Sequence, residues 1–113
     1  PGQARFDFLW KLLARGALGL IILVANSRPR PLEDLQVYLD GFADELAHLP
    51  CTIGVGRLDT HPVPPLSAFS EALALRNHVF PVLEVDVRRR ADVLLLIDSL
   101  LAQVEADLVD MHG

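Results

Sequence analysis

A chain of 113 residues is long enough for one domain, and its 51% hydrophobic and 22% charged residues exclude a disordered polymer. A net charge of −5 argues against nucleic acid and anionic membranes as partners, and no apolar run reaches the roughly 20 residues of a membrane span. A single cysteine excludes an internal disulfide and favours a cytoplasmic location.

The first half of the chain predicts a helix, a strand and a second helix. Residues 4–15 carry apolar side chains at helical spacing and end at Gly16. The continuous apolar run 17–26 predicts a parallel strand that is covered on both faces. Pro31 is placed to begin the next helix, whose apolar residues recur every three or four positions until Pro50 ends it.

The second half repeats the alternation. Residues 51–56 predict a short buried strand, and residues 57–65 form a loop before a helix that ends near Asn77. Residues 79–87 predict a strand, and Pro81 places it at the edge of a sheet. The last helix, at about 90–108, is expected to turn seven side chains inward: Val93, Leu96, Ile97, Leu100, Leu101, Val104 and Leu108.

The order of elements predicts a single α/β domain over residues 1–113. Helices that alternate with short parallel strands form right-handed crossovers on a layered sheet, here of three strands with four helices. Three strands are few for such a sheet, and the leading helix has no strand before it. The pattern therefore predicts that the chain begins within a domain whose N-terminal part is absent.

Polar residues follow each predicted strand, where ligands bind in open α/β sheets. These segments are Asn26-Ser27-Arg28, Gly56-Arg57-Leu58-Asp59 and Asp86-Val87-Arg88. With their order and spacing, the whole chain resembles the C-terminal part of a Ras-like small GTPase domain, in particular the bacterial gliding-motility type and its uncharacterised relatives. The resemblance implies a partial P-loop NTPase fold.

The first three residues resemble the end of a family motif. In the family, Asp-x-x-Gly-Gln precedes the switch II helix, and Pro1-Gly2-Gln3 would be its last three residues. The resemblance implies that the Gly2 amide bonds the γ-phosphate and that Gln3 is catalytic, orienting the attacking water. The alternative is a terminus without a functional role.

The segment after the second strand stands where the family has the guanine-reading Asn-Lys-x-Asp. The resemblance implies that Asp59 accepts two N–H groups from guanine. Gly56 stands in the place of Asn and Arg57 in the place of Lys. The alternative for Asp59 is a loop residue that caps the turn after it.

The segment after the third strand stands where the family has Ser-Ala-Lys. There the resemblance implies that the backbone of Asp86, Val87 and Arg88 meets the base. Arg89 and Arg90 fit a solvated helix start.

No Gly-x-x-x-x-Gly-Lys-Ser/Thr motif occurs in the sequence. The resemblance implies that the upstream part of the parent protein holds the phosphates and Mg²⁺, so this chain alone is not expected to hydrolyse GTP. The parent protein is expected to be a GTP-binding switch and GTP hydrolase, read by effector or regulatory proteins through residues 4–15.

The alternative function is a non-catalytic interaction domain with a degenerate GTPase-like fold. Such a domain would bind partner proteins and oligomerise, most simply through the apolar strand at 17–26, which has no charge to protect its edge. The four histidines have no ligand spacing, so no metal site is expected, and Cys51 is expected in the core.

Overall fold

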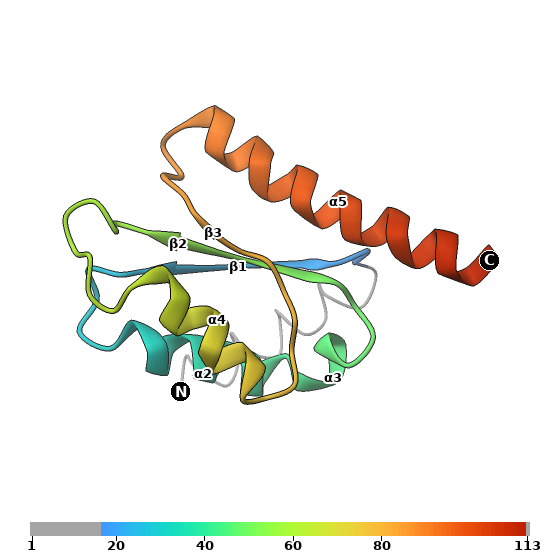
Figure 1. Ribbon diagram of the computed structural model, residues 1–113, viewed down its shortest axis with the longest axis horizontal. Coiled ribbons are helices and arrows are strands. Elements are labelled where there is room, and N and C mark those ends of the chain that lie inside the picture. The colour runs from blue at the N-terminus through green and yellow to red at the C-terminus, as the bar shows by residue number, and fades with distance from the viewer. Residues whose placement is uncertain (1–16, 113) are drawn as a thin grey trace, which may run out of the picture.

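The structure, a computed structural model, describes residues 17–112. Its middle layer is one sheet of three parallel strands in the order β1-β2-β3: β1 (Leu20–Ala25), β2 (Cys51–Gly56) and β3 (Val82–Glu84). On one face lie α2 (Pro31–Gly41), the short α3 (Ala43–Leu46) and α4 (Leu66–Ala74), and on the other lies α5 (Arg90–His112) (Figure 1). The predicted α/β class and three-layer arrangement are thus confirmed for these residues, whereas the helix expected at 4–15 lies outside them.

The strands β1 and β2 pair along their whole length. Leu20 lies opposite Cys51 and Ala25 opposite Gly56. The ladder between β2 and β3 continues beyond the ends of β3, because the Ile53 amide donates to the Pro81 carbonyl at 2.9 Å. Pro81 lacks an N–H, and β3 lies at an edge of the described sheet, as predicted, where that group is not required.

The main core lies between the sheet and the helices α2 and α4. Every residue of β2 from Cys51 to Val55 is buried, as the continuous apolar run predicts. The largest buried side chains of this core are Phe69, Leu35, Leu39, Ile53 and Leu73. Each contributes about 1.5–3 kcal/mol by leaving water, so burial in this layer is a main source of the free energy that holds α2 and α4 on the sheet.

The edge strand β1 differs from the prediction. Its Ile22 and Val24 are buried against the α2 layer, whereas Ile21 and Leu23 on the opposite face are 37% and 48% exposed. The apolar run therefore does not mark a strand covered on both faces. The physical reason is the position of α5, which packs mainly on β2 and covers β1 only in part.

The helix predicted from Pro31 to Leu49 is divided in two. The helix α2 ends at Gly41, and Phe42 leaves the helical region with φ −111° and ψ 23° before α3 begins. Glycine has the lowest helix propensity after proline, which explains why the break occurs there. Arg76, just after α4, donates to the Gln36 side chain at 2.7 Å and pairs with Asp40, so α2 and α4 are joined on their outer side.

The helix α5 is placed by small residues and one polar contact. A Cβ at Gly54 would lie 3.1 Å from Leu96, and a Cβ at Gly19 would lie 2.8 Å from Leu100, so both leucines fit against bare backbone. Between them, Gln103 donates to the hydroxyl of the buried Thr52. These contacts set both the height and the register of the helix on the sheet.

Three side chains predicted to point inward from α5 do not. Ile97, Leu101 and Leu108 are 40–50% exposed, whereas Leu96 is buried. The helix has 23 residues, about 35 Å, and the strands beneath it have at most six, about 20 Å. Its C-terminal part consequently runs past the end of the sheet (Figure 1). No helix within residues 17–112 is long and apolar enough to cross a membrane.

Candidate functional site

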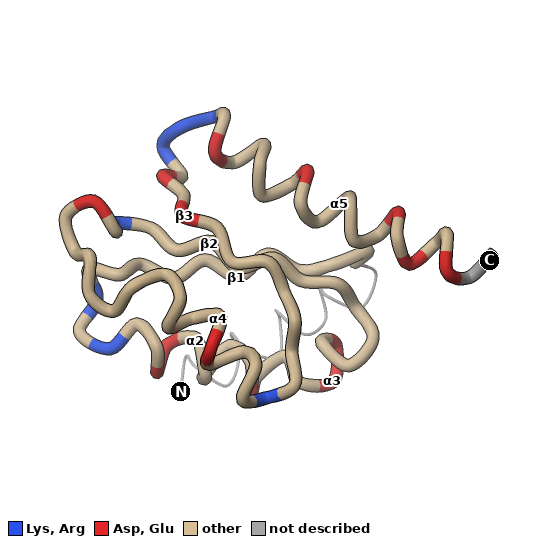
Figure 2. Tube along the Cα trace, in the orientation of Figure 1, with Lys and Arg blue, Asp and Glu red and all other residues tan. Residues whose placement is uncertain are grey.

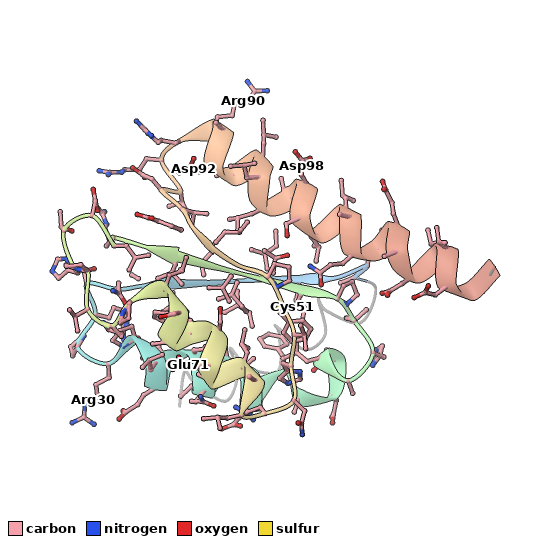
Figure 3. The ribbon with its side chains drawn as sticks, viewed as in Figure 1. Arg30, Cys51, Glu71, Arg90, Asp92 and Asp98 are labelled. Atoms are coloured by element: carbon pink, nitrogen blue, oxygen red, sulfur yellow. The ribbon has the colours of Figure 1, made fainter. Side chains whose placement is uncertain are left out.

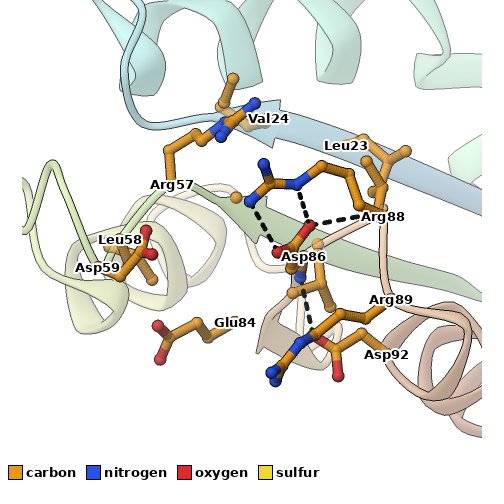
Figure 4. A pocket seen from close by; sticks show the side chains of 15 residues that line it. Leu23, Val24, Arg57, Leu58, Asp59, Glu84, Asp86, Arg88, Arg89 and Asp92 are labelled. Atoms are coloured by element: carbon orange, nitrogen blue, oxygen red, sulfur yellow. Dashed lines mark hydrogen bonds and ion pairs between the residues drawn. The ribbon is translucent and has the colours of Figure 1, made fainter.

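A hollow of about 690 Å³ opens at the carboxyl edge of the sheet, where all three strands end. Its lining includes six residues that the sequence predicts for nucleotide binding: Gly56, Arg57, Asp59, Asp86, Val87 and Arg88. Figure 4 shows Arg57 and Asp59 on one side of the hollow and Asp86 and Arg88 on the other. The predicted residues Gly2 and Gln3 lie outside the described residues.

Asp86 and Arg88 form a two-pronged ion pair at the rim. The Arg88 Nε and Nη2 atoms each donate to one carboxylate oxygen of Asp86 at 2.9 Å. These hydrogen bonds, joined by one from the Arg88 amide, lower the pKa of Asp86 to about 2. Asp86 is therefore ionised at neutral pH, and much of its accepting capacity is used within its own loop.

A second carboxylate fixes the same loop from α5. Asp92, in the first turn of that helix, accepts a 2.8 Å hydrogen bond from the Asp86 amide. The loop between β3 and α5 is thus held from both sides, which gives the rim a defined shape. Sequence reasoning missed Asp92, although an acidic residue in the first turn of a helix after a polar loop is a recognisable signal.

Arg57 adopts an uncommon backbone conformation at the end of β2. Its φ is +67°, in the left-handed region where a side chain is unfavourable. Asn77 has a similar φ of +62°, but it follows α4, where asparagine commonly ends a helix. Strain of this kind at the mouth of a hollow is characteristic of binding sites.

Asp59 is exposed and has one local hydrogen bond. Its Oδ1 accepts from the Thr60 amide at 2.9 Å, which is the capping arrangement that the sequence leaves open as an alternative. Capping and ligand binding are compatible, because a carboxylate offers about four acceptor positions. The pKa of Arg88 is raised mainly by its hydrogen bonds to Asp86, and the charge of Asp59 adds to that effect.

The loop that carries Arg57 and Asp59 is anchored by Asn26. This side chain is 3% exposed, and its amide donates to the carbonyls of His61 at 2.5 Å and Pro64 at 3.0 Å. The sequence places Asn26 at a strand end, but it gives no sign that this residue reaches 38 positions along the chain. The amide therefore positions the loop without lining the hollow.

The charges around the hollow nearly balance, with a small acidic excess. Three arginines, Arg57, Arg88 and Arg89, face four acids, Asp59, Glu84, Asp86 and Asp92. A polyphosphate carries several negative charges and prefers a surplus of cations and backbone amides. This lining consequently offers no surplus of positive charge to a polyphosphate.

The described residues hold no cluster of three or more histidine, cysteine or acidic side chains that could bind a metal ion. Cys51 is fully buried, as expected, in the core, and its burial raises the pKa of the thiol to about 12. The thiol is therefore the strongly favoured form at neutral pH, which fits a packing role in the core.

No family model, curated protein or solved structure matches the chain.

Proposed function

We propose that the hollow binds the base of a guanine nucleotide and that the chain is the base-binding part of a Ras-like GTPase domain. The observation that supports it is the convergence of Gly56–Asp59 and Asp86–Arg88, two segments about 30 residues apart in the sequence, around one hollow at the carboxyl edge of a parallel sheet. The parent protein would be a GTP-binding switch and GTP hydrolase.

Two residues carry the recognition in this proposal. The exposed carboxylate of Asp59 accepts the two N–H groups on the guanine edge, which is a bidentate, charge-assisted arrangement. The flat guanidinium of Arg57 stacks on the face of the base. The backbone of Val87, which also lines the hollow, lies on the opposite side and is available to the base oxygen.

In this proposal, the phosphates and Mg²⁺ bind to parts of the protein outside residues 17–112. The acidic excess of the lining offers no surplus of cations to the phosphates. By the resemblance, Gly2 contacts the γ-phosphate and Gln3 orients water, together with a phosphate loop upstream. The chain alone is then a binding unit without hydrolase activity, in a protein of the cytoplasm.

A nucleoside titration tests the proposal on the chain as it stands. Guanosine, which has no phosphates, is added at millimolar concentrations to ¹⁵N-labelled protein. We expect amide shifts confined to residues 56–59 and 86–88, with smaller shifts for adenosine. Asp59→Asn should exchange the preference from guanosine to xanthosine, because an amide offers a donor where xanthine offers an acceptor.

Two further variants separate binding from folding. Asp44 is an exposed acid on α3, outside the hollow, and Asp44→Asn should leave the preference for guanosine unchanged. Arg57→Gly should keep or raise the stability, because glycine tolerates φ +67°, while it weakens the binding of guanosine. Equal shifts for all nucleosides, or shifts away from the hollow, would contradict a base site here.

The second candidate is an interaction domain that binds no nucleotide. It is favoured by Asp86, whose carboxylate is engaged by Arg88 and by its own loop, and by Gly56 in place of asparagine. In this version, partner proteins bind through residues 4–15, which lie outside the described residues. Copies of the chain pair through the outer edge of β1, which has six uncharged residues. Light scattering of the chain tests the pairing: a particle of two or more copies supports it, and a monomer rejects it.

A further inference from the structure

The hollow at the carboxyl edge of the sheet has cationic and anionic side chains on different sides. Figure 2 shows both kinds of charge gathered where β2 and β3 end. In the closer view of Figure 4, Arg57 and Arg88 point towards one another on the side of β1, whereas Asp59 and Glu84 lie on the side away from β1. A ligand with N–H donors along one edge and acceptor atoms along another matches this division. Guanine is such a base, since N1 and the 2-amino group donate while O6 and N7 accept.

The acceptor edge of the base needs a donor from the lining of the hollow. Three lining side chains carry N–H donors, and these are Arg57, Arg88 and Arg89. In the guanine site proposed above, Arg57 lies on the face of the base. Figure 4 shows Arg89 on the far side of Asp86 from Arg57. Arg88 is therefore the side chain that remains to meet the acceptor edge.

Gly56 leaves space for the base at the end of β2. Its φ lies outside the left-handed region, so the backbone does not require a glycine at this position. A Cβ there would lie 3.5 Å from the carbonyl oxygen of Val85 and 4.0 Å from that of Val24, which are ordinary contact distances. The described neighbours therefore do not require a glycine either. Without a side chain, Gly56 widens the hollow and contributes no side-chain donor to it.

Asp86 holds the Arg88 guanidinium by only part of its donor set. The carboxylate accepts from Nε and Nη2. A guanidinium has further N–H groups, and Nη1 has no hydrogen-bond partner among residues 17–112. The ion pair already orders a long and otherwise mobile side chain, so a ligand that binds to Nη1 does not have to bear that cost.

We propose that Arg88 recognises N7 of the guanine, with Nη1 donating the hydrogen bond and Asp86 acting as the positioning residue for the guanidinium. This role rests on the guanine site proposed above, and it narrows the ligand to purine nucleotides whose N7 is an unmodified acceptor. Arginine makes the same kind of contact to guanine N7 and O6 in protein–DNA complexes. The backbone of Val87 remains assigned to O6, so neighbouring residues bind neighbouring acceptors of the base.

A ligand that differs in one atom tests the contact without altering the protein. In 7-deazaguanosine a C–H group replaces N7, while O6 and the N–H groups assigned to Asp59 are kept. Each nucleoside is titrated at millimolar concentrations into the ¹⁵N-labelled 113-residue chain, and Kd is obtained from the amide shifts of residues 56–59 and 86–88. We expect 7-deazaguanosine to bind about three- to tenfold more weakly than guanosine.

Matched variants identify the donor. Arg88→Met keeps much of the length of the side chain but removes its N–H groups, so it should bind the two nucleosides equally. Arg89→Met and Arg90→Met remove the same charge at the next two positions and should keep the difference. Figure 3 shows Arg90 extending outward from the start of α5. Circular dichroism verifies that each variant folds.

Two variants of Asp86 test its positioning role. Asp86→Ala releases the guanidinium of Arg88 and should bring the ratio of the two affinities towards one. Asp86→Glu can still pair with the guanidinium and should keep part of the difference. A residue that only stabilised the loop would change both affinities by the same factor and leave their ratio unchanged.

Three outcomes would overturn the role of Arg88 while the base site stands. These are equal affinity of the parent chain for the two nucleosides, a difference that Arg88→Met leaves intact, and a difference that all three arginine variants abolish alike. The last of these would show that the general positive charge of the loop, and not a directed hydrogen bond, senses N7. An absence of shifts at both segments with every nucleoside would instead reject the base site, and the role of Arg88 with it.

Discussion

Gln103 of α5 donates a 2.8 Å hydrogen bond to the hydroxyl of Thr52, a side chain with no exposed surface in the central strand. The same hydroxyl lies 3.4 Å from that of Ser99. The Thr52 hydroxyl thus makes the polar contact between α5 and the described sheet, which is otherwise apolar. A helix held only by leucines can slide by a turn, whereas this bond is satisfied in one register alone.

Removing one partner of the Gln103–Thr52 hydrogen bond should lower the free energy of unfolding more than removing both partners. Thr52→Val keeps the shape of the side chain but leaves the Gln103 amide only its longer, 3.4 Å hydrogen bond to the Ser99 carbonyl, and we expect a loss of about 0.5–1.5 kcal/mol. Adding Gln103→Leu should restore part of that loss, because the Gln103 amide is then absent and only the half-buried Ser99 hydroxyl has lost a partner. Urea unfolding of the two single variants and the double variant measures the coupling. Strictly additive losses would show that the bond has no energetic role.

Glycine at position 54 is required by the packing of α5. A Cβ there would lie 2.9 Å from Leu23, 3.0 Å from Val85 and 3.1 Å from Leu96. We expect Gly54→Ala to lower the free energy of unfolding by about 1–3 kcal/mol through overpacking. Gly41→Ala is the control, because no atom lies within 4 Å of its Cβ position. At the end of α2, alanine should be neutral or add up to about 1 kcal/mol. Equal urea midpoints for the two variants would contradict this account.

Asn26 should control the order of the loop that carries Arg57 and Asp59. Asn26→Ala leaves the carbonyls of His61 and Pro64 without their donor, at an expected cost of about 1–3 kcal/mol. Hydrogen exchange of the His61 amide, which donates to Arg57 within this loop, should accelerate. Ser27→Ala changes an exposed neighbour and should stay within about 0.5 kcal/mol of the parent chain. Unchanged hydrogen exchange in Asn26→Ala would mean that the loop is ordered without the hydrogen bonds of Asn26.

The pair between Asp86 and Arg88 predicts a pH dependence at low pH. Arg88 lowers the pKa of Asp86 in the folded state from 3.8 to about 2, so the ionised carboxylate favours the fold. The stabilisation is complete above the ordinary value and is lost as the pH falls towards 2. An NMR titration of the Asp86 carboxyl carbon should give about 2, and Arg88→Gln should raise it towards the ordinary value.

Arg90→Gln serves as the control for that titration. Arg90 is exposed at the start of α5 and carries the same charge, yet it does not contribute to the lowered pKa of Asp86. Its removal should leave the titration midpoint unchanged. If both arginine variants shift the midpoint equally, the general field of the loop, and not the two-pronged pair, sets the pKa.

The sequence predicts the fold well where local pattern and burial agree. The strand that the sequence predicts at 51–56 is present over the same residues, because an apolar run between proline and a polar loop is buried on both sides in the structure. The prediction failed at β1 and along α5, where apolar side chains at the right spacing remain exposed. Spacing shows which residues share a face, but it does not show whether another element lies against that face.

The candidate site, like the fold, could be predicted from the sequence only in part. The segments at the strand ends could be predicted, because the carboxyl ends of parallel strands meet at one edge of a sheet. The contributions of Asn26 and Asp92 could not, since each depends on a hydrogen bond to a loop that the tertiary fold brings near. Nucleotide binding at this edge remains a prediction.

The two edge strands of the described sheet are protected to different degrees against pairing with a further strand. β3 offers three residues, flanked by Pro81, whereas β1 offers six residues without a charge or a proline. The edge at β1 is therefore the better suited of the two to pair with a further strand. A lysine introduced at Ile21, on this strand, should disfavour such pairing, and light scattering of the variant and the parent chain measures the difference.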